Sequence, residues 1–140
     1  MLRRSRALPA DVRTAEQAFF VVVGVLEPAK AGLSDVLPGT RMPGRPLADA
    51  LAAFVEGLER AVPLMPAWQH AAVQEGWLAC DQGLTEALAR ARRLRQAAPD
   101  VAGFEGLLGL VESLLDPLDP FADAEAVFRD LRTGRRVRSH

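Results

Sequence analysis

Residues 47–62 read LADALAAFVEGLERAV, and the apolar members of this stretch recur at the spacing of one helix face. They follow one another at steps of four, three, four and four residues and are Leu47, Leu51, Phe54, Leu58 and Val62. An α-helix completes a turn in about 3.6 residues, so this spacing places the five side chains in one stripe. Pro46 suits the first position of such a helix, where its missing N–H has no partner to lose. The stretch therefore predicts an amphipathic helix with one buried face.

A longer helix is predicted over residues 66–98, a stretch rich in the good helix formers Ala, Leu, Gln, Glu and Arg. At a rise of about 1.5 Å per residue, an unbroken helix of this length would measure about 50 Å, which exceeds the width of a small domain. It would have to protrude, bend or pack against a second copy. Gly76 and Gly83 weaken it and share one face, because they lie one heptad apart. The sequence leaves open whether the stretch is continuous.

The N-terminal part of the chain predicts another helix, which begins near Asp11 or Thr14 and ends or kinks at Pro28. Its central residues, 18–26, read AFFVVVGVL, and their β-branched side chains would suit a strand as well. We favour a helix, because no second strand is apparent to pair with this segment and a lone strand is not stable. Glycines and prolines mark residues 32–46 as the loop that follows.

Two more helices are predicted near the C-terminus, because apolar residues recur there at helical spacing. The first follows Asp100, which suits its N-cap, and carries its apolar face between Phe104 and Leu115, while the second covers residues 120–132. The segment DPLDP, residues 116–120, is predicted to separate them as a turn. Asp119 suits the N-cap of the last helix and Pro120 its first position.

Length and composition indicate one folded domain, since the chain has 140 residues of which 49% are apolar. We therefore predict an all-α, single-domain bundle of four to five helices over residues 11–132. A flexible basic arm at residues 1–10 and a flexible basic tail at residues 133–140 are expected to flank it.

Composition and spacing exclude several classes of protein. A single cysteine, Cys80, and two histidines, His70 and His140, rule out a disulfide scaffold and a zinc cluster of Cys and His. The apolar run at residues 18–26 has nine residues, whereas a membrane-spanning helix needs about 20. Phosphate-binding and catalytic motifs are missing, and no cofactor or metal is implied. We therefore expect a cytoplasmic protein that is not an enzyme and does not contact membranes.

A candidate contact surface lies on the predicted helix that follows Asp100. Gly103, Gly106 and Gly109 recur there at every third position, with Ser113 nearby. Three glycines cost a helix about 2–3 kcal/mol in intrinsic propensity, and small residues let another backbone come close. That backbone belongs either to a helix of the same chain or to a partner. We name Gly103, Gly106, Gly109 and Ser113 as candidate partner contacts.

The distribution of arginine raises a second hypothesis, binding to nucleic acid. Residues 1–13 carry a net charge of +3, residues 129–140 carry +4, and the middle of the chain carries −8. A further basic cluster near the end of the predicted long helix consists of Arg90, Arg92, Arg93 and Arg95. Basic segments bind phosphate backbones, but no aromatic residues alternate with these arginines to stack on bases. Because 16 of the 17 basic residues are arginine, a compositional bias explains the pattern more simply.

A third hypothesis is a small-molecule pocket inside the bundle, lined by Trp68, His70 and Trp77. His70 and Asp81 fall on one face of the predicted helix, as a general base and an orienting carboxylate would. They are about 16 Å apart along the helix axis, however, and cannot touch. Cys80 lies next to Asp81 and lacks the positive surroundings that a reactive thiolate needs. The sequence therefore offers a pocket without a catalytic pair.

The function that these observations favour is contact with proteins. Few polar residues are spaced so that they would lie together in an active site, which argues against an enzyme. A long helix and a glycine-lined helix both favour self-association, so the expected partner is a second copy or another protein.

Overall fold

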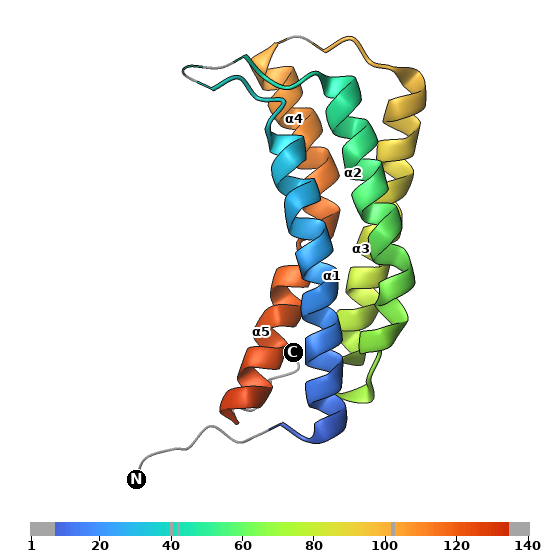
Figure 1. Ribbon diagram of the computed structural model, residues 1–140, viewed down its shortest axis with the longest axis vertical. Coiled ribbons are helices and arrows are strands. Elements are labelled where there is room, and N and C mark those ends of the chain that lie inside the picture. The colour runs from blue at the N-terminus through green and yellow to red at the C-terminus, as the bar shows by residue number, and fades with distance from the viewer. Residues whose placement is uncertain (1–7, 40, 42, 102, 135–140) are drawn as a thin grey trace.

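The computed structural model describes residues 8–39, 41, 43–101 and 103–134 of the chain. These residues form five α-helices joined by loops and short 3₁₀ segments, and no β-strand occurs among them (Figure 1). The helices are α1 (Ala10–Ser34), α2 (Leu47–Ala61), α3 (Gln74–Ala97), α4 (Phe104–Leu115) and α5 (Pro120–Thr133). The predicted all-α bundle is confirmed. Residues 1–7 of the predicted basic arm and 135–140 of the predicted tail lie outside the described residues.

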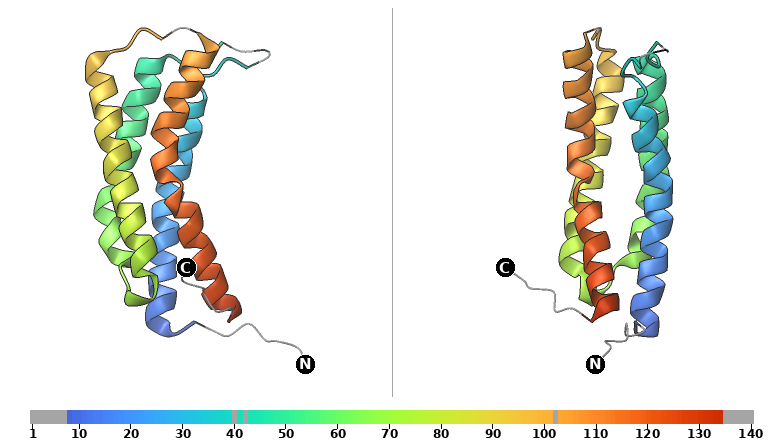
Figure 2. Two further views of the ribbon diagram at one scale, coloured as in Figure 1. Left: turned by 180° about the vertical axis from the view of Figure 1, so that it is seen from behind. Right: turned by 90° about the vertical axis from the view of Figure 1, so that its left-hand side faces the viewer.

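The five helices of the described chain make four rods, because α4 and α5 follow one another end to end. The 3₁₀ segment Asp116–Leu118 joins them, and both Asp116 and Asp119 have right-handed helical dihedral angles. The DPLDP segment therefore does not turn the chain back but bends one continuous rod (Figure 2). The right-hand view of Figure 2 shows two layers, with α1 and α2 in one and α3 and the α4–α5 rod in the other. The bundle thus has four rods, where the sequence predicted four to five helices.

The long helix is shorter than predicted, because it begins at Gln74 rather than near residue 66. Pro66 belongs to a 3₁₀ segment, Val62–Trp68, that continues α2. The backbone then becomes extended at Gln69 and His70, with ψ angles of 116° and 144°, and this reverses the chain direction. The helix α3 therefore spans 24 residues and needs neither a protrusion nor a second copy to accommodate its length.

The helix α1 is longer than predicted, with 25 residues. It begins at Ala10, so Thr14 lies one turn inside the helix, where its hydroxyl donates a hydrogen bond to the Ala10 carbonyl. The central residues 18–26 are helical, which confirms the choice of helix over strand. Pro28 lies inside α1 and does not end it. The carbonyl that Pro28 leaves without an N–H donor belongs to Gly24, which is exposed, so water can replace the lost hydrogen bond.

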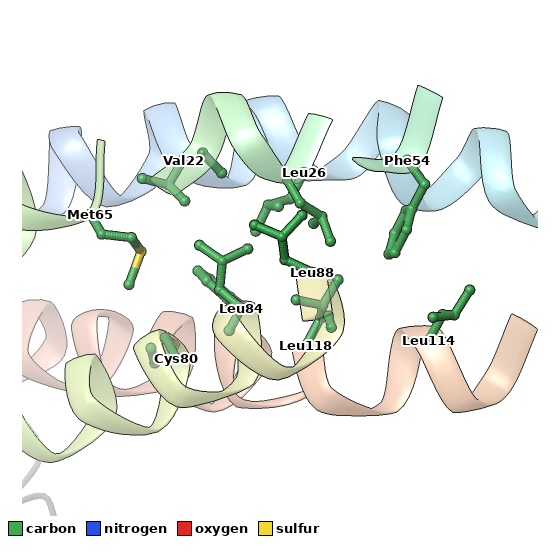
Figure 3. Close-up of a cluster of buried hydrophobic side chains, with 14 of the residues drawn as sticks. Val22, Leu26, Phe54, Met65, Cys80, Leu84, Leu88, Leu114 and Leu118 are labelled. Carbon is green, nitrogen blue, oxygen red and sulfur yellow. The ribbon is translucent and has the colours of Figure 1, made fainter. Parts of the chain in front are cut away.

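The core lies between the two layers and contains side chains from all four rods (Figure 3). Phe54 and Leu58 of the predicted stripe are fully buried there, whereas Val62 is 44% exposed at the start of the 3₁₀ segment. An aromatic cluster fills the half of the core near the N-terminus of α1. Phe19 lies at its centre, with ring centroids 4.9 Å from Trp68 and 5.2 Å from Phe128.

Glycine lets the rods approach closely at two buried positions. A Cβ atom at Gly83 would lie 1.9 Å from the Pro117 carbonyl oxygen, and one at Gly57 would lie 2.6 Å from the Ala29 Cβ. Gly76 faces Ala124 of α5. Gly76 and Gly83 therefore face the same neighbouring rod, which confirms that they share one face of α3.

Candidate interaction surface

The four candidate contacts at α4 do not form a close helix crossing within the described chain. Gly103 is the N-cap of α4, Gly106 lies beside the Val101 side chain, and a Cβ at Gly109 would meet no described atom within 4 Å. The Ser113 hydroxyl donates a hydrogen bond to the carbonyl of Leu110, one turn earlier. The interpretation of these glycines as an intrachain crossing is therefore wrong at Gly103 and Gly109, while partner contact stays a prediction.

The neighbourhood of these glycines is only lightly buried. In α4 only Val111 and Leu114 are buried, although most of the helix is apolar. Phe104, which follows Gly103, is 53% exposed. This end of α4 is therefore a small apolar patch at the surface.

A larger exposed apolar surface lies on α1. We call it the outer face of α1, and its exposed residues are Arg13, Gln17, Phe20, Val21, Gly24, Glu27, Pro28 and Ala31. Phe20 and Val21 are 43% and 56% exposed, while their neighbours Phe19 and Val22 are completely buried. An apolar run on a helix faces all directions, so the core takes one half of it and the other half remains at the surface.

Gly24 lies in the middle of the outer face and has no packing role among the described residues. A Cβ at this position would meet no described atom within 4 Å. Glycine in the middle of a helix is less stable than alanine by about 0.5–1 kcal/mol, so the residue carries a cost. At Gly57 and Gly83 a close contact with another rod explains this cost, whereas the part of the chain that the structure describes offers no such contact at Gly24.

A shallow groove runs beside the outer face, between α1 and α5. One cavity of about 70 Å³ has walls that include Val23 and Phe121. An open depression of about 220 Å³ is lined by Glu16, Phe20, Glu125, Arg129 and Arg132. Ligand pockets usually have at least about 300 Å³, so neither cavity has the size of a small-molecule site.

One buried ion pair fixes this groove. Glu16 is 3% exposed and is the only charged residue buried in the described core. Its carboxylate accepts a hydrogen bond from Arg132 of α5, whose side chain is 57% exposed. A buried charge requires such a partner, because desolvation of an unpaired carboxylate is costly. The pair thus ties the N-terminal half of α1 to the end of α5.

The predicted pocket residues Trp68, His70 and Trp77 make separate contacts in the described part of the chain. Trp68 is buried in the aromatic cluster, and its indole N–H contacts the Met65 sulfur at 3.3 Å. The indole N–H of Trp77 donates a hydrogen bond to the Met65 carbonyl at 2.9 Å. Both tryptophans therefore contact Met65, in the 3₁₀ segment that continues α2. The two cavities in the groove between α1 and α5 have other residues in their walls. A ligand at these three residues stays a prediction.

His70 has a carboxylate partner, but it is Asp11 rather than Asp81. Its Nε2 lies 2.7 Å from the Asp11 Oδ2, while its Nδ1 accepts a hydrogen bond from the Ala72 N–H. The hydrogen bond to His70, followed by one to the Val12 backbone, lowers the pKa of Asp11 below its ordinary value of 3.8. Since both ring nitrogens are engaged, His70 links α1 to the connection before α3 and has no free nitrogen for base catalysis.

The four arginines of the basic cluster are not equally available. Arg90 donates hydrogen bonds to the Ser113 carbonyl at 2.8 Å and to Glu86 at 2.5 Å, so it joins α3 to α4. Arg92 lies 3.8 Å from Glu59 of α2. Arg93 and Arg95 are exposed and form no ion pair with any residue that the structure describes.

The remaining reactive groups do not assemble a site in the described part of the chain. Burial, with a smaller contribution from Asp123, raises the pKa of the Cys80 thiol to about 12. No group of three His, Cys, Asp or Glu side chains within 8–39, 41, 43–101 and 103–134 is placed to hold a metal ion. None of the helices described is both long and apolar enough to cross a membrane. The chain matches no known protein family, no curated protein and no solved structure.

Proposed function

We propose that this protein is a non-enzymatic helical bundle that works through protein–protein contacts and associates with itself. The observation that supports this proposal is the outer face of α1, where Phe20 and Val21 are exposed although the core is filled without them. Burying one such side chain contributes about 1.5–3 kcal/mol, so covering this face would favour association. The proposal includes a cytoplasmic location, which a single, unpaired cysteine suits.

The test is the molar mass in solution as a function of protein concentration, measured by light scattering. We expect the mass of the wild type to rise from that of a monomer toward that of a dimer. Val21→Glu is expected to remain monomeric, because it places a charge in the contact. Val62→Glu is the matched control, since Val62 is an exposed valine outside α1. A wild type that stays monomeric at high micromolar concentration would contradict the proposal.

Binding to nucleic acid is the second candidate function, and the free guanidinium groups of Arg93 and Arg95 favour it. Contacts with phosphates release counterions, so the affinity should fall steeply as salt rises. We expect a change of Arg93 and Arg95 together to Glu to weaken binding to a DNA or RNA duplex. The same double change at Arg90 and Arg92, which are engaged with Ser113, Glu86 and Glu59, should weaken it less. An affinity that does not change between low and moderate salt excludes this candidate.

A further inference from the structure

The outer face of α1 has features that indicate how two copies fit together. We infer that two copies of this chain pair through this face with their α1 helices antiparallel, about a two-fold axis that passes near residue 22. This inference rests on the proposed self-association and adds its geometry. Three observations support it, namely the spacing of the exposed residues, the match of large and small residues, and the order of charges.

The exposed residues follow the repeat that two paired helices need. Gln17, Val21, Gly24, Pro28 and Ala31 are exposed and succeed one another at steps of four, three, four and three. This spacing averages 3.5 residues, the repeat that keeps one seam of a helix against a neighbouring helix. The face is therefore a continuous seam along α1 rather than a single exposed side chain.

The large and small residues of the seam are complementary under a two-fold rotation. An axis near residue 22 sets Phe20 and Val21 of one copy against Gly24 of the other, and the reverse contact follows by symmetry. The open space over Gly24 gives the room that these side chains need. This arrangement supplies the packing role that Gly24 lacks among the described residues of its own chain.

The charges at the two ends of the face favour the antiparallel orientation. Arg13 is exposed at the N-terminal end of the outer face, and Glu27 is exposed toward its C-terminal end. Antiparallel pairing places Arg13 within about 6 Å, measured along the axis, of Glu27 in the second copy. Parallel pairing would place Arg13 against Arg13 and Glu27 against Glu27, which is unfavourable.

A larger side chain at Gly24 tests the packing. A Cβ at Gly24 would meet no described atom within 4 Å, so leucine fits at this exposed position in the single copy. We expect Gly24→Leu to weaken dimerisation at least tenfold, because the leucine occupies the place of Phe20 from the second copy. Val62→Leu, which enlarges an exposed side chain outside α1, should dimerise like the wild type. Equal dimerisation of Gly24→Leu and wild type would overturn the inference.

Single cysteines test the orientation. Gln17 and Glu27 are equidistant from residue 22, so in an antiparallel pair position 17 of one copy lies level with position 27 of the other. We expect a mixture of Gln17→Cys and Glu27→Cys chains, one carrying a size tag, to form the mixed cross-link with a short thiol-reactive linker. Each variant alone should cross-link weakly, and the buried Cys80 should not react.

The outcomes separate the two proposals. Strong cross-linking within each single variant would show a parallel pair and overturn the antiparallel geometry, while self-association would stand. A dimer that cross-links at neither position would have the same consequence and place the contact elsewhere. A wild type that is monomeric in the light-scattering measurement would overturn the proposed function itself.

Discussion

The helices α1 and α2 lie side by side in one layer, yet they use their apolar residues differently. In α2 the apolar residues form one stripe, and Phe54 and Leu58 are fully buried. In α1 the apolar run continues around the helix, so Phe19 and Val22 enter the core while Phe20 and Val21 remain exposed. The helix α1 therefore has more apolar residues than the core can bury, and the excess forms a second apolar surface that α2 lacks.

The largest difference in stability is expected between alanine variants of a buried phenylalanine, Phe54, and of an exposed one, Phe20. Phe54→Ala should lower the free energy of unfolding by about 3–5 kcal/mol, because it leaves a cavity in a closely packed core. Phe20→Ala should lower the stability of the monomer by only about 1 kcal/mol, since the side chain is half exposed. Denaturant unfolding at a concentration that keeps the protein monomeric measures both. Similar losses for the two variants would contradict the division of α1 into inner and outer faces.

The glycines of the two regions should respond in opposite directions to alanine. Gly83→Ala should destabilise the protein by about 1–3 kcal/mol, because its Cβ would overlap with the Pro117 carbonyl. Gly24→Ala should stabilise the monomer by about 0.5–1 kcal/mol, because the site is open and alanine is the better helix former. Thermal unfolding of the two variants beside the wild type checks this. A loss of stability in Gly24→Ala would reveal a contact at Gly24 that the structure does not show.

The polar links of α1 should also differ in strength. Arg132→Ala leaves the buried Glu16 without its partner, and we expect a loss of about 1–2 kcal/mol, less than for a fully buried pair because Arg132 is half exposed. Arg132→Lys should recover part of the loss. Urea unfolding at neutral pH measures the stability of both variants. If Arg132→Ala were as stable as the wild type, water would be replacing the guanidinium.

The smallest effect is expected at the exposed link between Asp11 and His70. The pKa of Asp11 is lower in the folded protein than in the unfolded chain, so the ionised carboxylate contributes stability above about pH 4. This contribution is lost as the pH falls through the folded-state pKa, below 3.8. Asp11→Asn should therefore melt at a lower temperature than the wild type at pH 7, and the difference should shrink below about pH 4. A difference that is independent of pH would exclude this linkage.

The sequence predicted those features of the fold that depend on spacing along one helix. The stripe in α2 and the shared face of Gly76 and Gly83 are of this kind. Val62 departs from the stripe because the chain becomes a 3₁₀ helix there, and the long helix was overestimated because nothing in its composition marks the reversal at Gln69. Local patterns thus predict helices well and their ends less well.

Contacts between distant segments were not predictable in the same way. Glu16 and Arg132 are 116 residues apart, and Asp11 and His70 are 59 apart, so no periodicity connects them. The glycines near α4 predicted a contact surface by their regular spacing, whereas the run at residues 18–26 was predicted only to be helical. A signal for the outer face was present, because β-branched residues on every side of a helix exceed what one buried face can cover.

Thiol labelling at single introduced cysteines tests most directly whether a second copy covers the outer face of α1. Val21→Cys and Val62→Cys place thiols at two exposed positions, and the buried Cys80 is not expected to react. As the protein concentration rises, we predict that labelling slows at position 21 and stays constant at position 62. Labelling at position 21 that is as fast in concentrated as in dilute protein would contradict the account.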